Sequence, residues 1–212
     1  MKIGVLGAGM IGGTLGRLWL EAGHEVRFAT RRPDEVAGLL GKLGPRASAS
    51  MPAGAVEFGE ALLLAVPLLA VPQLGRDHAA AAAGKTVLDA TNPSPQRDGE
   101  VAVAAQQADH GSSAWVASQL GGAQVVKAFN TVYFKLLASE AHRRGDLLGI
   151  PLASDHPAAL EVAARLVRDA GFEPVIAGPL AEGAKFEPGS RLFNTGMSAA
   201  QLRGALGSSR VP

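Results

Sequence analysis

Residues 2–13, KIGVLGAGMIGG, decide the fold of this chain. The run KIGVL has the apolar, β-branched character of a buried strand, and the glycines that follow it, Gly7, Gly9 and Gly12, match the pattern G-x-G-x-x-G. An apolar pattern with helical spacing starts at once and continues over residues 11–22. Strand, glycine-rich turn and helix in this order are typical of a dinucleotide-binding fold, in which backbone N–H groups at the helix start face a pyrophosphate. An ordinary strand–helix turn is the alternative, and the flanking strand and helix make it much the weaker one.

The same alternation of short apolar runs and Ala/Leu-rich segments continues to the end of the chain. It predicts a Rossmann-type, doubly wound α/β fold with a mainly parallel sheet and a small C-terminal extension. A soft boundary near Asn130 divides the chain into a dinucleotide-binding domain, residues 1–130, and an α/β extension, residues 131–212, that completes the substrate pocket. The expected strands and their exits are residues 2–7, 25–30, 61–66, 86–93, 123–130, 147–153 and 174–177. The expected helices are residues 11–22, 33–43, 68–83, 112–120, 157–170 and 198–206.

Three expectations concern the connections between these elements. Pro33 is a typical first-turn residue for the helix that follows it. Residues 94–111, polar and rich in Gly, Gln and Asp, are expected to form a long loop over a site. Ser112 or Ser113 is expected to cap the helix after that loop.

The composition narrows the class of function. Hydrophobic residues make up 47% of the 212 residues and the net charge is +1, so a packed core is expected and a broad basic surface for nucleic acid is not. With no cysteine, disulfides, thiolate metal sites and cysteine nucleophiles are excluded, and the five histidines are scattered, so no metal site is expected. The most apolar run, residues 61–71, is too short to span a membrane, and the N-terminus lacks the features of a signal peptide. These observations favour a cytoplasmic protein with no membrane partner.

A pair of arginines stands at the end of the second expected strand, in FATRRPDE, residues 28–35. A cofactor with a free ribose 2′-hydroxyl is held at this position by Asp or Glu. Here the position carries Thr30, Arg31 and Arg32, and no acid precedes Asp34. A carboxylate would repel a 2′-phosphate, whereas guanidinium groups and a hydroxyl bind one. A solvated arginine pair on a surface turn is the alternative, but this place in the fold favours NADP(H) over NAD(H).

Several stretches of the chain carry a resemblance to a known family. They are VLGAGMIGGTLGRLWLEAGHEV (5–26), ATRRP (29–33), LLLAVP (62–67), VVKAFNT (125–131) and IAGPL (176–180). Together they resemble the NADPH-dependent reductases similar to coenzyme F420H2:NADP⁺ oxidoreductase, and the resemblance covers Lys2 to about Leu180. Pyrroline-5-carboxylate reductase shares the first motif but has a longer helical dimerisation domain that is not expected here. The cytosolic domain of the STEAP ferric reductases is also similar, but no transmembrane part is expected in this chain.

The resemblance implies a role for the residues at each strand end, and a homodimer. For the pyrophosphate it implies Gly7, Ala8, Gly9, Met10, Ile11 and Gly12, and for the 2′-phosphate Thr30, Arg31 and Arg32. For the adenosine–ribose side it implies Ala65, Val66 and Pro67, and for the border of the nicotinamide Thr91, Asn92 and Pro93. The residues that flank the nicotinamide and meet the second substrate would be Ala128, Phe129, Asn130, Thr131 and Val132, with Gly196 and Met197. F420-using archaeal members tend to have His where this chain has Asn130, so the resemblance specifies the family better than the acceptor.

Three functions are compatible with these features. The favoured one is hydride transfer between NADPH and F420 or a flavin-like acceptor, with the Asn130 amide as a hydrogen-bond donor to the acceptor. The second is reduction of a small imine or carbonyl compound, which needs a proton donor. Tyr133 and Lys127 are nearest in sequence, but Tyr133 is expected to form pocket wall and Lys127 to end its strand and reach solvent. The third is a protein that senses NADP(H) without turnover.

Overall fold

The computed structural model describes residues 1–32 and 37–207, and within them eight strands form one sheet in the order β3-β2-β1-β4-β5-β6-β7-β8. All neighbouring strands pair in parallel except β6 and β7. The order of β1 to β6 is that of a Rossmann fold, with the switch point between β1 and β4, so the predicted fold class is confirmed. The strands are β1 (Lys2–Leu6), β2 (Glu25–Ala29), β3 (Ala47–Ser50), β4 (Ala61–Leu64), β5 (Thr86–Asp89), β6 (Gln124–Lys127), β7 (Gly149–Ala153) and β8 (Glu173–Gly178).

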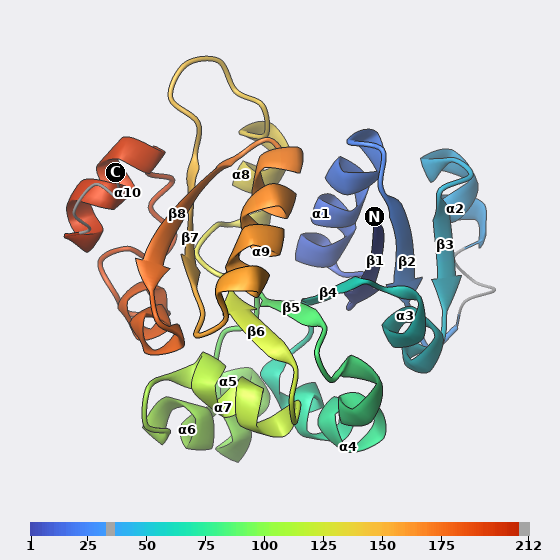
Figure 1. The fold of residues 1–212 in the computed structure, drawn as a ribbon, viewed down its shortest axis with the longest axis horizontal. Helices are drawn as coiled ribbons and strands as arrows, with labels where there is room; N and C mark the ends of the chain where they lie inside the picture. The colour runs from blue at the N-terminus through green and yellow to red at the C-terminus, as the bar shows by residue number, and fades with distance from the viewer. Residues whose placement is uncertain (33–36, 208–212) are drawn as a thin grey trace.

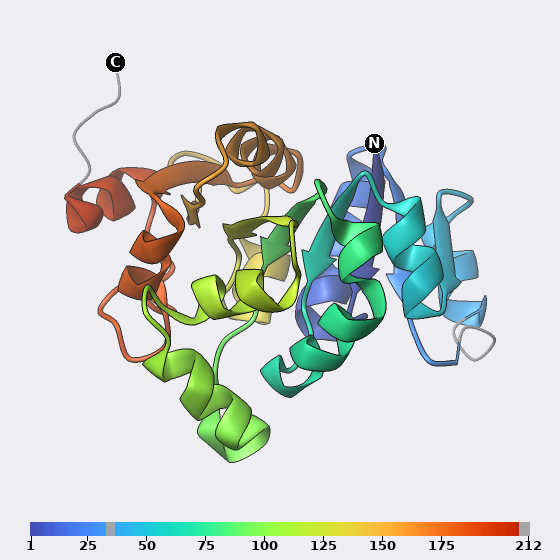
Figure 2. The same ribbon diagram turned by 60° about the horizontal axis from the view of Figure 1, so that its bottom comes forward.

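Helices cover both faces of this sheet (Figure 1). On β4, Leu63 packs with the helices of one face, whereas Leu62 and Leu64 pack with those of the other, which explains why the whole strand is apolar. The first face carries α1 (Met10–Glu21), α8 (Phe134–Ser139) and α9 (Pro157–Asp169). The second carries α3 (Pro52–Phe58), α4 (Val71–Ala82) and α7 (Ser112–Gln119), and Figure 2 brings α4 and α7 forward. The remaining elements are α2 (Ala37–Leu43), η2 (Leu68–Ala70), α5 (Pro95–Asp98), α6 (Glu100–Gln107), η3 (Leu180–Phe186) and α10 (Ala199–Leu206).

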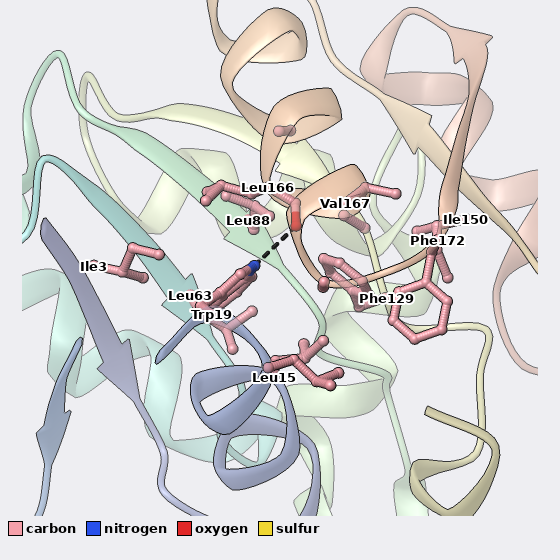
Figure 3. Packing of buried hydrophobic residues seen from close by; sticks show 14 of the residues in the cluster. Ile3, Leu15, Trp19, Leu63, Leu88, Phe129, Ile150, Leu166, Val167 and Phe172 are labelled. Atoms are coloured by element: carbon pink, nitrogen blue, oxygen red, sulfur yellow. Dashed lines mark hydrogen bonds between the residues drawn. The ribbon is translucent and has the colours of Figure 1, made fainter. Parts of the chain in front are cut away.

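One aromatic cluster joins the N-terminal and C-terminal parts of the chain (Figure 3). Trp19 of α1 is fully buried, and its indole Nε1 donates a hydrogen bond of 2.8 Å to the carbonyl of Leu166 in α9. Its ring meets Phe129 edge-on at 6.2 Å between centroids, and Phe129 meets Phe172 in the same way at 6.3 Å. Each such pair contributes about 0.5–1.5 kcal/mol of stability beyond the contribution of the apolar area that it buries. The backbone just after β6 is therefore anchored in the core.

The structure corrects the expected connections. Residues 94–111 are not a loop, because α5 and α6 lie within them and Ala102 and Ala105 of α6 are buried. Ser112 and Ser113 are not caps either: the N-cap of α7 is Gly111, and Glu187 accepts from the backbone N–H of Ser112 at 3.0 Å. Strand β3 and the helices α3 and α8 were not expected from the sequence. The role expected for Pro33 falls outside the described residues.

The sheet continues past the boundary expected near Asn130. Strands β6 and β7 pair in the antiparallel sense through Lys127 and Ala153, and β7 and β8 then extend the sheet as a parallel pair. The parallel order thus ends at the expected boundary, and the division into two domains stays a prediction. In the described part of the chain, no helix has the length and apolar character needed to cross a membrane.

Candidate functional site

The ends of five strands meet along one edge of the sheet. Leu6 of β1 stands beside Ala29 of β2 and Leu64 of β4, and Asp89 of β5 stands beside Leu64 on one side and Lys127 of β6 on the other. Because the five strands are parallel, their carboxyl ends form one row, and ligands of open α/β sheets bind outside this row. The structure therefore brings together the segments after each strand, which are residues 7–12, 30–32, 65–67, 90–93 and 128–130.

The three glycines of the first turn differ in the space that a side chain would have at each position. A Cβ on Gly12 would lie 1.9 Å from the carbonyl oxygen of Gly7, and one on Gly7 would lie 2.4 Å from that of Ala65. Both glycines are thus required by the packing of the protein itself, and Gly7 also has φ +106°. A Cβ on Gly9 would meet nothing within 4 Å. The open space over Gly9, at the start of α1, fits a group that approaches the backbone closely, as a pyrophosphate does.

The turn after β2 presents its arginines to solvent. Arg31 and Arg32 are exposed, and the backbone N–H of Arg32 donates to the hydroxyl of Thr30 at 3.2 Å. Thr30 and Ala8 of the glycine loop line the same cavity. The two motifs that would hold a 2′-phosphate and a pyrophosphate are therefore neighbours in space, and Asp34 lies outside the described residues.

Three adjoining cavities follow the strand ends away from this turn, and Asn92 lines all of them. The switch-point cavity, of about 240 Å³, is lined by Met10, Ile11, Ala65, Val66, Pro67, Ala90, Thr91, Asn92 and Arg97. The ring cavity, of about 310 Å³, is lined by Ile11, Ala90, Asn92, Phe129, Asn130, Val132, Tyr133, Phe134, Phe193 and Asn194. The outer cavity, of about 470 Å³, is lined by Asn92, Pro93, Ser94, Pro95, Gln96, Arg97, Gln106, Pro188, Gly189 and Phe193.

A buried ion pair holds the turn that leads to Asn92. The Asp89 carboxylate accepts from the backbone N–H of Thr91 at 2.9 Å and from its hydroxyl at 2.7 Å. The Lys127 ammonium donates to the carbonyl of Thr91 at 2.8 Å and to the other carboxylate oxygen of Asp89 at 3.3 Å, and Ser113 donates to that oxygen too. Both charged side chains are fully buried. The expectation that Lys127 reaches solvent is wrong, because the strand ends supply a carboxylate and a carbonyl inside the protein.

An amide pair joins the ends of β5 and β6. The side chain of Asn92 donates to the backbone carbonyl of Asn130 at 2.8 Å, and that of Asn130 donates to Oδ1 of Asn92 at 3.1 Å and to the carbonyl of Phe186 at 3.0 Å. Phe129, just before, has φ +62°, a backbone conformation that costs a bulky residue energy and is held by the packing of its ring. Both protons of the Asn130 amide are thus engaged, while its Oδ1 is buried without a hydrogen-bond partner among the described residues. A donor role for Asn130 would require one of these bonds to break.

The residues expected from the C-terminal part lie close to the ring cavity, but on another side of it. Thr131, Gly196 and Met197 line a separate cavity of about 10 Å³, and Val132 lines both. The wall of the ring cavity comes instead from Phe193 and Asn194, which sequence reasoning missed.

A signal for this wall was present in the sequence, since the tripeptide F-N-T occurs at residues 129–131 and again at 193–195. The backbone N–H of Asn194 donates to the carbonyl of Thr131 at 2.8 Å, and its Oδ1 accepts from the backbone N–H of Tyr133 at 3.1 Å. Tyr133 is 46% exposed and forms part of the wall, with its ring centroid 4.6 Å from that of Phe134 and the two ring planes tilted by 60°.

Arg97 and Asp98 form a second charged pair that the sequence did not indicate. The carboxylate of Asp98 has no exposed surface and accepts from Nε of Arg97 at 2.9 Å and from its Nη2 at 2.7 Å. Burial acts to raise the pKa of Asp98, but the hydrogen bonds from Arg97 and from the backbone of Ser94 and Leu69 hold it below its ordinary value. The hydrogen bond with Asp98 raises the pKa of Arg97, against the opposing effect of its partial burial. The guanidinium is therefore a fixed cation between the switch-point and outer cavities.

Comparison with protein families gives a match over four of the five strand ends just described, those of β1, β2, β4 and β5. Residues 2–93 match the model of a family of NADP-binding oxidoreductases, described as NADP oxidoreductase, coenzyme F420-dependent. The family resemblance is confirmed over these residues. The match includes the glycine loop, the arginine turn and Asn92, and it ends before Asn130. A shorter match, 46% identical over 41 residues, is to the YjhV protein of Escherichia coli K12 and covers 19% of this chain and 30% of that protein.

Solved structures share the fold over most of the chain. The hypothetical protein SMa0349 of Sinorhizobium meliloti is 25% identical, with a TM-score of 0.77 over 93% of this chain and 95% of that one. A protein of Arthrobacter sp. FB24, provisionally assigned as an F420-dependent NADP reductase, is 23% identical, with a TM-score of 0.70 over 98% of this chain and 95% of that one. An imine reductase of a Pseudomonas species is 18% identical, with a TM-score of 0.61, and this chain spans 57% of its length.

Proposed function

We propose that this protein is an NADP(H)-dependent oxidoreductase that transfers a hydride between NADPH and a flavin-like or deazaflavin acceptor such as F420. The observation that carries the proposal is the continuous run of cavities along the strand ends, with open space over Gly9 at its start and an apolar ring cavity farther along. The family match over residues 2–93 supports it independently.

The residues at the strand ends fit NADP(H) bound with its 2′-phosphate at the arginine turn and its nicotinamide near Asn92. Backbone N–H groups at Gly9 and Met10 would hold the pyrophosphate, and the exposed Arg31 and Arg32 would hold the 2′-phosphate. The turns 65–67 and 91–93 would border the ribose and the nicotinamide. NADPH, when bound, supplies the hydride, and the protein contributes position and the exclusion of water.

The ring cavity suits a flat acceptor that needs no dedicated acid. Its wall is largely aromatic and aliphatic, with Phe129, Tyr133, Phe134 and Phe193 among its lining residues. The only titratable side chain among its described lining residues is Tyr133. A flavin or deazaflavin that accepts a hydride there would be oriented by the rigid Asn92–Asn130 pair. We expect the protein to be cytoplasmic, as its composition favours, and to act as a homodimer, as the family resemblance implies.

Reduction of a small imine or carbonyl compound is the second candidate, and the position of Tyr133 favours it. Tyr133 lines the ring cavity, and its phenol could donate the proton that such a substrate requires. Lys127 cannot serve in the same way, because its ammonium is fully buried behind Thr91 and paired with Asp89.

The experiment that tests the proposal measures NADPH oxidation with separate acceptors. Purified protein is mixed with NADPH and F420, FMN, FAD or a cyclic imine, and the absorbance of the reduced nicotinamide is followed. We expect oxidation with at least one of the ring acceptors. Oxidation with the imine alone would favour the second candidate. Tight binding of NADPH without oxidation by any acceptor would contradict both and favour a protein that senses NADP(H).

A further inference from the structure

Arg97 has hydrogen-bonding capacity that no other described residue uses. Its Nε and Nη2 donate to Asp98, and Nη2 also donates to the backbone carbonyl of Asn92 at 2.9 Å. These bonds account for the N–H groups on Nε and Nη2 and leave both N–H groups of Nη1 without a partner among the described residues. The side chain is 47% exposed, so this free edge is accessible to a ligand.

Asp98 acts as the support that fixes this edge in place. Its carboxylate has no exposed surface and also accepts from the backbone N–H groups of Ser94 at 3.1 Å and Leu69 at 3.4 Å. The Asp98 carboxylate is thus hydrogen-bonded to two backbone amides as well as to Arg97, and the Arg97 guanidinium is the exposed member of the pair. A planar fork held at one edge is suited to bind a phosphate or carboxylate with the other.

The position of Arg97 indicates which molecule would supply the anion. The outer cavity is lined by no residue of the glycine loop, and Arg97 is the only charged side chain among its described lining residues. It adjoins the ring cavity through Asn92 and Phe193, which line both. A substituent on a ring bound in the ring cavity would therefore extend toward Arg97, whereas the pyrophosphate of a dinucleotide is already provided for by the backbone at Gly9.

We propose that the outer cavity is a subsite for an anionic substituent, a phosphate or carboxylate, of the second substrate, and that Arg97 is the residue that recognises it. The proposal rests on the proposed function, since it takes the ring cavity as the place of the acceptor ring. It implies that the acceptor is an extended, negatively charged molecule rather than a small neutral imine.

FMN and riboflavin test this proposal because they share one ring system and differ by a single phosphate. Their equilibrium binding is measured by flavin fluorescence in the presence of NADP⁺, so the result does not depend on turnover. We expect wild-type protein to bind FMN about tenfold more tightly than riboflavin. The variant Arg97→Gln with Asp98→Asn, which keeps a hydrogen-bonded pair without charge, should lose this preference.

Two further variants make the result specific. Gln106→Ala removes an uncharged side chain from the same cavity and should keep the preference for FMN. Arg97→Lys keeps the ion pair with Asp98 but removes the planar edge, and should weaken the preference even if the neutral pair fails to fold.

Three results would overturn the proposal. If the neutral pair binds NADPH less tightly while the FMN preference is unchanged, Arg97 serves a phosphate of the dinucleotide instead. If neither quantity changes, or if wild-type protein has no preference for FMN, the edge recognises no anion of the second substrate. Loss of NADPH oxidation with every acceptor would count against the proposed function, whereas the ratio of the two flavin affinities would still decide the role of Arg97.

Discussion

The two ends of the cavity row are built in different ways. At the glycine-loop end, backbone groups from one continuous stretch, residues 7–12, form the surface, and the open space over Gly9 follows from local chain geometry. At the Asn92–Asn130 end, which is the acceptor end, the two asparagine side chains donate to backbone carbonyls 38 and 56 positions away, and a buried ion pair supports this arrangement. The first end depends on backbone shape, and the second on long-range contacts that must all form together.

The largest effect is expected from breaking the buried ion pair, which should affect the acceptor end and leave the glycine-loop end unchanged. Lys127→Met leaves the Asp89 carboxylate buried without its cation, which costs about 3–5 kcal/mol of folding stability. We expect the Asn92 turn to loosen and urea unfolding to shift accordingly. The affinity for adenosine 2′,5′-bisphosphate, which reaches only the glycine-loop end, should change by no more than about twofold in the folded protein.

The double variant Lys127→Met with Asp89→Asn is the matched control. It removes both charges and keeps an acceptor for Thr91, so it should be more stable than Lys127→Met alone. A single variant as stable as wild type would show that the pair does not support the acceptor end.

A pair of glycine variants tests the glycine-loop end. Gly12→Ala places a Cβ 1.9 Å from the carbonyl oxygen of Gly7 and should cost about 1–3 kcal/mol of stability. In Gly9→Ala the new Cβ meets nothing within 4 Å, and the φ of −75° suits alanine, so stability should change by less than about 0.5 kcal/mol. Thermal unfolding and titration with NADPH should show that Gly9→Ala loses NADPH affinity without losing stability. Unchanged NADPH affinity in Gly9→Ala would be inconsistent with a pyrophosphate at this loop.

Acid should weaken the acceptor end through Asp98. Because its pKa is lowered in the folded protein, the Arg97–Asp98 pair stabilises the fold above the unfolded carboxyl pKa of about 3.9, and this contribution is lost as the pH falls below that value. Urea unfolding from pH 6 down to pH 3 should show a steeper loss of stability for wild type than for Arg97→Gln with Asp98→Asn. Parallel curves would mean that the pair contributes nothing to acid sensitivity.

The smallest effect is expected from Tyr133→Phe. If the acceptor is a flavin or deazaflavin, the phenol is only wall, and kcat with that acceptor should change by less than about threefold. If a phenol proton is needed, kcat should fall by about 100-fold or more. Steady-state kinetics with the acceptor found active above distinguishes the two results.

The difference between local backbone geometry and long-range contacts also explains which features could be predicted from the sequence. The glycine loop, the arginine turn and the strands β1, β4, β5 and β6 follow from local patterns, since each depends on a few consecutive residues. Arg97 was missed because residues 95–107 are mostly polar or alanine, and Val101 and Val103 are the only large apolar residues among them. The burial of Lys127 could not be predicted, because it depends on Asp89, 38 positions earlier in the chain. The roles of the cofactor-contacting residues at each strand end stay predictions.

The central claim is that the edge of the sheet binds NADP(H) with its 2′-phosphate at the arginine turn, and calorimetric titration with NADPH and NADH tests it most directly. Wild-type protein should bind NADPH about 100-fold more tightly than NADH, since two charge-assisted contacts to the phosphate are each worth about tenfold. Arg31→Ala with Arg32→Ala should remove most of this preference, while Arg143→Ala with Arg144→Ala, an arginine pair in the loop before β7, should keep it. Equal affinity for NADPH and NADH in the wild type, or the same loss of both in the Arg31 and Arg32 variant, would contradict the account.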